Sequence, residues 1–170
     1  MDVTPSLHQE LEVRARRMLR ARKLPSDPET LSLVNEAWVK MANANEPTLE
    51  SRGEQLAYYA TVLRSVLLNL ARHRTAARRG GGQRHVHIGD SGVQPGEEDA
   101  DAQVLDVDEK LAKLHDHDAD LARIVELRFF GGLTWDEVSE VVGKNPKVVQ
   151  ADWEFARLWL RGELADGRDE

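Results

Sequence analysis

Apolar side chains recur at intervals of three and four residues through much of the chain, which predicts a protein built from amphipathic helices. The first helix is expected over residues 5–23, where Leu11 and Met18 belong to one apolar stripe. The same spacing predicts a second helix over 28–44 and a third over 53–79. No useful length of sequence alternates between apolar and polar residues, so we expect essentially no β-sheet.

The helical spacing stops after the third helix. Residues from about 80 to 106 are rich in Gly, Asp and Glu, include Pro95 and lack periodicity, so we expect a flexible acidic linker over 83–107. The spacing then resumes in four segments, expected at residues 107–114, 118–130, 134–143 and 145–160. The predicted fold is all-α, with two small helical domains at 1–82 and 108–170, the second containing a helix-turn-helix.

Capping residues mark the boundaries of the last two helices. Thr134, followed three residues later by Glu137, predicts a capping box, and Gly143 suits the end of the same helix. Asn145 followed by Pro146 predicts an N-cap and a first helical position. Two capped helices joined by so tight a turn indicate a helix-turn-helix. This favours nucleic acid as the partner, although helix hairpins without DNA-binding function are more common.

The last helix has an apolar face and a polar face. Its apolar positions are Val149, Trp153, Ala156 and Leu160, widened by Val148, Phe155 and Trp159. We expect this broad face to be buried. Its polar positions are Lys147, Gln150, Ala151, Glu154, Arg157 and Arg161. Lys, Gln and Arg side chains contact base edges and phosphates, so the polar face suits a DNA major groove.

Composition narrows the class of protein. The 170 residues, 41% of them hydrophobic, allow one or two small domains. The absence of cysteine excludes disulfides and thiolate metal sites, and it fits a reducing compartment. No apolar run approaches the length of a bilayer span, and no signal segment begins the sequence. We therefore expect a soluble, cytoplasmic protein without membrane contact.

The charge is unevenly distributed. The net charge of −7 argues at first against a DNA-binding protein, because phosphate contacts require lysine and arginine. Residues 1–85, however, carry 14 basic and 9 acidic side chains. Residues 86–107 carry six acidic side chains and no basic one, and residues 108–170 carry 9 basic and 15 acidic ones. The N-terminal part is therefore basic and the segment after it purely acidic.

No set of residues predicts catalysis or metal binding. The pairs His85 with His87 and His115 with His117 have a spacing of two, which is poor for chelation, so surface histidine is the simpler interpretation. The glycines at 80–82 are not a phosphate loop, because no GKS or GKT sequence follows them. Hydrolase and zinc-protease motifs are also absent. We expect no enzyme activity, no metal and no cofactor.

Four segments, in this order along the chain, resemble a bacterial RNA polymerase sigma factor of the extracytoplasmic-function (ECF) type. They are LVNEAWVK at 33–40, ARHRTAARRGGG at 71–82, VELRFFGGLTWDEV at 125–138 and DWEFARLWL at 152–160. The resemblance covers about residues 5–165. It implies a dissociable subunit that binds core RNA polymerase and directs it to promoter DNA.

The resemblance also implies a role for each region. The first domain would bind the β′ clamp helices and the minus-ten element, and the second would bind the minus-thirty-five element and the β flap. The acidic linker would thread a positively charged channel of polymerase, where it imitates nucleic acid. The residues implied for polymerase binding are Leu33, Val34, Glu36, Trp38 and Val39.

Two further residue sets follow from the resemblance. The opened minus-ten strand would contact the loop at 43–55 together with Tyr58, Arg64, Asn69, Arg72, Arg74, Arg78 and Arg79. Tyr58 would stack on bases and the arginines would hold phosphates, whereas Tyr59 is expected in the core. The minus-thirty-five element would contact Lys144, Asn145, Lys147, Gln150, Ala151, Glu154 and Arg157.

Two departures from the family pattern change the expectations. Gln150, Ala151 and Glu154 stand where relatives usually carry basic residues, so we expect weak DNA binding by the isolated second domain and strong dependence on polymerase. The second helix lacks the usual acidic start. One hypothesis is that phosphorylation of Thr30 or Ser32 restores the negative charge at this helix start. The favoured interpretation is that the two residues simply begin the helix. On the phosphorylation hypothesis a kinase would be an additional partner, and an anti-sigma factor is a separate candidate partner.

Two other functions remain open at this point. A stand-alone helix-turn-helix regulator would bind duplex operator DNA without polymerase, normally as a dimer, but no dimerisation helix is evident. A sigma-like interaction protein would keep the fold without promoter activity, which the weakly basic last helix permits. The relative arrangement of the two domains is also open, because a flexible linker allows either a compact inhibited form or an extended one.

Overall fold

The computed structural model describes residues 5–21, 28–43, 51–80 and 97–166. Over these ranges the chain is helical and contains no strand, which confirms the all-α prediction. The elements are α1 (Pro5–Ala21), α2 (Pro28–Asn43), α3 (Arg52–Gly80), α4 (Glu97–His117), α5 (Ala119–Val125), the π-helical turn η1 (Glu126–Phe130), α6 (Trp135–Val142) and α7 (Pro146–Asp166).

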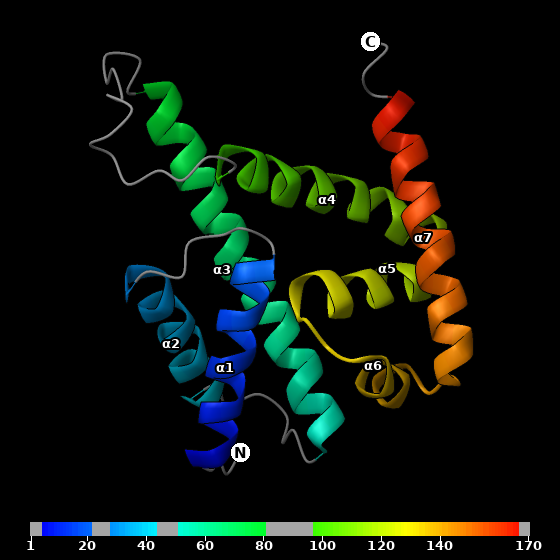
Figure 1. Cartoon of the computed structure of the whole chain (residues 1–170), viewed down its shortest axis with the longest axis horizontal. Coiled ribbons are helices and arrows are strands. Elements are labelled where there is room, and N and C mark those ends of the chain that lie inside the picture. The colour runs from blue at the N-terminus through cyan, green and yellow to red at the C-terminus, as the bar shows by residue number, and fades with distance from the viewer. Residues whose placement is uncertain (1–4, 22–27, 44–50, 81–96, 167–170) are drawn as a thin grey trace.

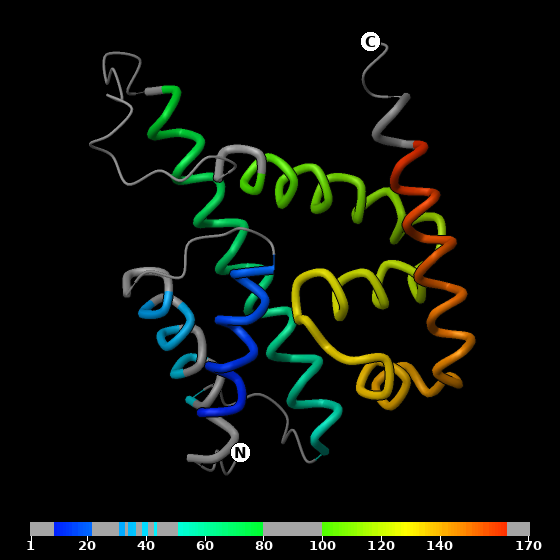
Figure 2. The backbone as a smooth tube through the Cα atoms, viewed as in Figure 1, coloured from blue at the N-terminus to red at the C-terminus, as the bar shows by residue number. Residues whose placement is uncertain are grey.

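The long helix α3 is the centre of the arrangement (Figure 1). The helix α2 packs on one side of α3, and α4, η1 and α6 pack on the other. The helix α7 lies along the outer side and contacts α4, α5 and α6. The tube in Figure 2 shows the same arrangement, with α4 crossing the C-terminal half of α3. The two halves that the sequence suggested as separate domains therefore contact each other in this conformation.

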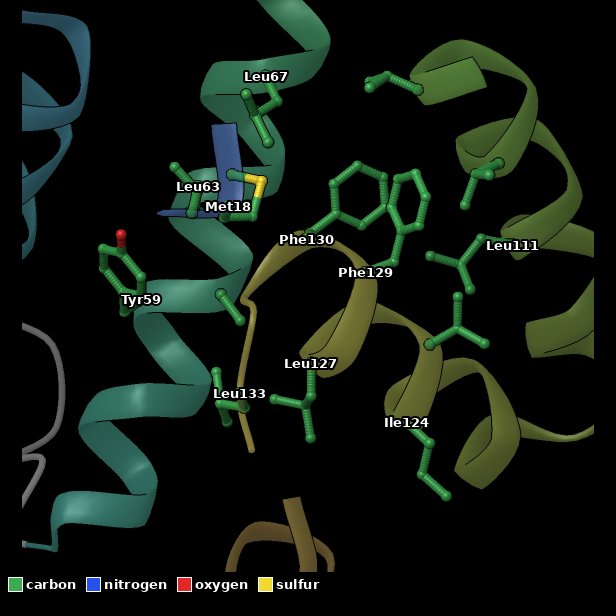
Figure 3. Packing of buried hydrophobic residues seen from close by; sticks show 14 of the residues in the cluster. Met18, Tyr59, Leu63, Leu67, Leu111, Ile124, Leu127, Phe129, Phe130 and Leu133 are labelled. Carbon is green, nitrogen blue, oxygen red and sulfur yellow. The ribbon is translucent and has the colours of Figure 1, made fainter. Parts of the chain in front are cut away.

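One apolar core joins the two halves (Figure 3). In this view Leu67 of α3 and Met18 of α1 lie toward Phe130 of η1, and Phe129 lies beside Phe130. Phe130 is fully buried, and its ring lies 4.9 Å from that of Phe129 in an edge-to-face arrangement. Burial of aromatic side chains supplies large stabilisation per residue, so this contact holds α3 against the C-terminal half.

Two adjacent glycines follow η1. Gly131 is buried, and a Cβ atom there would lie 2.7 Å from the Cβ of Ala60 on α3 and 2.8 Å from the Leu133 side chain. Gly132 has a φ of 63°, a conformation that residues with a side chain rarely adopt. The pair lets the chain pass close to α3 and turn into α6.

The prediction of a linker over 83–107 is wrong for its second half. Residues 83–96 lie outside the described residues, but 97–107 form the first half of α4. Their apolar side chains continue a helical stripe that is buried at Ala100, Val104, Val107, Leu111 and Leu114. The many intervening carboxylates give this stretch a linker-like composition, which concealed the spacing.

Candidate nucleic-acid interface

The start and end of α6 are fixed by the predicted side chains. The Thr134 hydroxyl accepts a hydrogen bond from the Glu137 backbone N–H (3.2 Å), and the Glu137 carboxylate accepts one from the Thr134 N–H (2.8 Å). Gly143 adopts the left-handed conformation with φ of 71°, and its N–H donates to the Ser139 carbonyl. The capping box and the glycine end of this helix are confirmed.

The turn into α7 is closed by equally local bonds. The Asn145 side chain accepts a hydrogen bond from the Lys147 N–H at 2.9 Å, which confirms Asn145 as the N-cap before Pro146. The Ser139 hydroxyl donates to the Lys144 carbonyl, so α6 is bonded directly to the turn. The two helices pack against each other in the order of a helix-turn-helix.

The buried face of α7 is narrower than predicted. Val149, Ala156 and Leu160 are buried as expected, and Trp153 and Trp159 are half-buried. Val148 and Phe155, predicted for the same face, are instead 47% and 53% exposed. Since α4, α5 and α6 all cover one side of α7, only one stripe of the helix can be buried, and these two residues project from another.

The predicted polar face of α7 is exposed but carries an apolar stripe. Lys147, Gln150, Ala151 and Glu154 are exposed, as expected for residues that contact DNA. The exposed apolar residues on the same side are Val148, Ala151, Phe155 and Leu158, at spacings of three and four. Leu158 is 64% exposed. This surface, which we call the α7 outer face, therefore combines few charges with large apolar side chains.

Two basic residues of the predicted minus-thirty-five set are paired within the chain. The Lys144 ammonium lies 3.0 Å from Asp152 and 3.8 Å from Asp120, and the hydrogen bond to Asp152 raises the pKa of Lys144. The Arg157 guanidinium lies 3.3 Å from the Glu154 carboxylate. Lys147 is thus the predicted basic residue of this set that is exposed at the N-terminal end of α7.

The predicted arginines of α3 meet acidic residues of α4. The Arg64 Nε lies 3.0 Å from the Asp108 carboxylate, which is also 3.7 Å from Arg72. The Arg78 guanidinium lies 3.0 Å from Asp101. The same Asp101 carboxylate is 3.6 Å from Arg74. The structure thus gathers these four arginines on one side of α3 and places two carboxylates of α4 against them, while Glu126 of η1 lies 3.8 Å from Arg64.

The remaining predicted residues of α3 differ in accessibility. Asn69 and Arg79 are exposed, and Tyr58 is half-buried beside a cleft of about 380 Å³ between α3 and α6. Tyr59 is buried, and its hydroxyl donates a hydrogen bond to the Leu11 carbonyl at 3.1 Å. Burial raises the pKa of the Tyr59 phenol. The prediction of Tyr59 as a core residue is confirmed. Of the loop predicted at 43–55, residues 44–50 lie outside the described residues.

The α2 residues predicted for polymerase binding are divided between surface and core. Glu36 and Val39 are exposed, and Val39 is 52% exposed. Val34 is only 4% exposed because it packs in the core of this chain, so its side chain is not on the surface that a partner would contact. The side chains of Leu33, Trp38 and Thr30 lie outside the described residues, and Ser32 is exposed.

An ion-pair network that the sequence did not predict joins α1, α3 and α6. The Arg14 guanidinium lies 2.8 Å from Glu137, the capping-box residue of α6, and 2.9 Å from Glu10. The Arg52 guanidinium of α3 lies 3.0 Å from the Glu10 carboxylate. Glu10 and Arg14 have the local spacing of a helical pair, but Arg14 and Glu137 are 123 positions apart. No local signal could have indicated that contact.

This network predicts a stability that depends on pH. The hydrogen bond from Arg52 lowers the pKa of Glu10 to about 2, against burial, which raises it. Burial alone would raise the pKa of Glu137, but the hydrogen bond from Arg14 lowers it overall. A carboxylate whose pKa is lower in the folded than in the unfolded state stabilises the fold at pH values above its unfolded pKa. The stabilisation from Glu10 is therefore lost as the pH falls from about 4.5 to about 2.

Glu10→Gln is expected to lower the free energy of unfolding by about 1 kcal/mol at pH 7, since the side chain is partly exposed. The variant should also show a shallower decline in stability between about pH 5 and pH 2. Urea unfolding at a series of pH values measures both effects. The control is Glu12→Gln, which removes an exposed ion pair with Arg16. It should change the free energy of unfolding by about 0.3 kcal/mol. Equal slopes for Glu10→Gln and the parent would contradict the expectation.

The described residues offer neither a metal site nor a membrane helix. Within those ranges no three His, Asp or Glu side chains lie close enough together to hold a metal ion. His117 instead stacks on Trp159 with ring centroids 5.8 Å apart, while His85 and His87 lie outside the described residues. Every helix in the described ranges is too short or too polar to cross a bilayer.

Comparison with known proteins identifies the family. The model of the ECF sigma factor family matches residues 2–166, nearly the whole chain. Neither the curated proteins nor the solved structures contained a match. The matched range includes α2, the basic helix α3, the turn η1 and the capped pair α6 and α7, on which the four resembling segments lie. The chain belongs to the family of ECF sigma factors.

Proposed function

We propose that this ECF sigma factor binds core RNA polymerase through α2 and selects promoters through two DNA-binding surfaces, one on α3 and one on α7. Its family acts in transcription initiation together with RNA polymerase and promoter DNA. The observation that carries the proposal is the presence of both surfaces in one chain: four arginines gathered on one side of α3, and the exposed outer face of a capped helix, α7.

The α3 surface suits a single DNA strand. Guanidinium groups form paired hydrogen bonds with phosphate oxygens, and exposed Asn69 and Arg79 extend the surface beyond the four gathered arginines. Tyr58 supplies an aromatic ring for stacking near the N-terminal half of the helix. In our proposal these residues hold the opened minus-ten strand.

The α7 outer face would read the minus-thirty-five element mainly through shape and methyl groups. In a major groove, an apolar side chain contacts the C5-methyl group of thymine, while glutamine can pair with adenine. Val148, Ala151 and Phe155 present apolar surface, and Gln150 supplies the amide. With few free cations on this face, we expect the chain alone to bind promoter duplex weakly, and polymerase to supply most of the remaining affinity.

Phe155→Ser should reduce initiation by the holoenzyme about tenfold at promoters with thymine in the minus-thirty-five element, which corresponds to about 1.4 kcal/mol of lost contact. Replacing those thymines with uracil, which lacks the methyl group, should weaken the parent but hardly affect the variant. The measurement is run-off transcription from matched thymine and uracil templates. Val13→Ser, which truncates a similarly exposed apolar side chain on α1, is the control and should behave as the parent. If uracil templates reduce transcription by Phe155→Ser as much as by the parent, Phe155 does not contact the thymine methyl groups.

Polymerase binding is tested by capture of purified core enzyme on the immobilised chain. The proposal expects stable capture, and a loss of about tenfold in affinity for Val39→Asp, because a charge replaces exposed apolar surface on α2. Val13→Asp introduces the same charge on α1 and should bind as the parent does. A stand-alone regulator would capture no core enzyme. A sigma-like interaction protein would capture it but start no transcription.

A further inference from the structure

We infer that α4 acts as an internal substitute for the promoter strand: its carboxylates occupy the arginines of α3, so the free chain is closed and must release α4 before α3 can bind DNA. The inference rests on the proposed function of α3. It goes beyond that function because it assigns a regulatory role to the segment that follows the first three helices.

The charges on the two helices are matched in register. Asp101 and Asp108 are seven residues apart, two helical turns, and therefore project from the same side of α4. Asp108 meets Arg64 and Arg72, while Asp101 meets Arg74 and Arg78. As the residue numbers rise along α3 they fall along α4, so the two helices have opposed directions where they cross. Each carboxylate lies between two guanidinium groups, where our proposal for α3 places a phosphate.

The contact is a packed interface as well as a set of ion pairs. The Asp101 side chain is only 1% exposed, and Asp108 is 20% exposed. Ala100, Val104 and Val107 of α4 are buried in the same core as Leu67 and Leu68 of α3. While α4 lies there, its carboxylates engage Arg64, Arg74 and Arg78, so a promoter strand cannot contact the full set of α3 arginines. The closed form therefore excludes DNA by direct competition for the same cations.

The closed form covers the arginines of α3 but leaves the α7 outer face exposed. Phe155 and Leu158 on that face are more than half accessible. Arg72 also stays accessible, with 60% of its side chain exposed, so an incoming strand or partner has a first cation to contact. The structure thus leaves the α7 face open while α3 is occupied. Core polymerase, which binds through α2 in our proposal, is the expected trigger for releasing α4.

The test compares neutralised carboxylates on two sides of α4 in the full chain. In the double variant Asp101→Asn with Asp108→Asn, isosteric amides replace the carboxylates that face α3. In the control, Asp106→Asn with Glu109→Gln changes the net charge by the same amount at exposed positions. Binding of a fluorescent single-stranded DNA, without polymerase, is measured by anisotropy at fixed salt.

Removal of the internal competitor should raise DNA affinity about tenfold, as expected if neutralising the carboxylates raises the small open fraction about tenfold. The control should gain less than about twofold, from net charge alone. An equal gain in both double variants, or no gain in either, would overturn the closure. Asp108→Asn alone, at the more accessible position, should show a smaller gain in the same direction and serves if the double variant does not fold.

A second measurement follows the opening itself. Because the chain has no cysteine, Val13→Cys and Leu158→Cys provide two unique labelling sites, both exposed, on α1 and α7. When saturating single-stranded DNA is added, energy transfer between dyes at these sites should fall in the inner double variant and fall less in the control. Unchanged transfer in the inner variant contradicts the inference.

The inference and the proposed function fail in different ways. If the parent holoenzyme initiates at promoters and the inner variant shows no gain in DNA affinity, closure is wrong and the proposed function stands. If no variant initiates transcription with core enzyme, the proposed function is wrong.

Discussion

Phe130→Ala is expected to lower the free energy of unfolding by about 3–5 kcal/mol, the largest loss for any single truncation considered. Phe130 is fully buried, packs edge-to-face on Phe129 and lies 5.5 Å from the guanidinium of Arg64. Its removal leaves a cavity where α3 meets η1, because the long helix cannot collapse into the space. Urea unfolding followed by circular dichroism measures the loss.

The matched control is Phe155→Ala. Phe155 is the same residue type but is 53% exposed on α7, so its truncation should change stability by less than about 0.5 kcal/mol. The shared core also predicts that the parent unfolds in one cooperative transition. Two separated transitions, with Phe130→Ala altering one alone, would show that the halves are not packed together as described.

Gly131→Ala should destabilise by about 2–3 kcal/mol, although alanine is normally the better residue in regular structure. The added methyl group would lie 2.7 Å from both the Ala60 Cβ and the Leu127 carbonyl oxygen, closer than atoms approach without a shift. Ala60 belongs to α3, so relief of that contact requires η1 to move away from α3, whereas the Leu127 carbonyl belongs to η1 itself, so relief there distorts the turn. The same unfolding experiment detects the loss, together with reduced contact between the two halves in the energy-transfer assay.

Gly162→Ala provides the opposite expectation. No atom lies within 4 Å of a Cβ placed there, and the residue belongs to the helix α7. This substitution should stabilise the chain by up to about 1 kcal/mol through helix propensity. If Gly131→Ala proves as harmless as Gly162→Ala, the close approach of η1 to α3 is not present in solution.

The features predictable from sequence are those fixed by neighbouring residues. The capping box of Thr134 with Glu137, the left-handed Gly143 and the Asn145 cap each depend on atoms within five positions. The starts and ends of α1, α2 and α3 followed from apolar spacing and differ from the structure by two residues at most. The same spacing predicts Tyr59 as a core residue. Local chemistry and helical period sufficed for these elements.

The features that the sequence does not predict depend on tertiary packing between helices. The apolar stripe of α4 was masked by its acidic residues, because composition outweighed spacing in the prediction of a linker. Apolar spacing predicts Phe155 on a widened buried face of α7, yet this helix is covered on one side only. The resemblance predicts Val34 on a partner surface, but α2 packs that position against the chain itself. The contact between Arg14 and Glu137 requires the tertiary fold.

The most direct test of the central claim is transcription by purified core RNA polymerase on a pool of genomic DNA fragments, with and without the full chain. The proposed function predicts that the chain starts transcripts at a restricted set of sites sharing one minus-ten and one minus-thirty-five sequence. It also predicts that the chain alone does not protect those sites. Transcripts unchanged by the chain, or tight protection of duplex sites without polymerase, would contradict the assignment of promoter selection to α3 and α7.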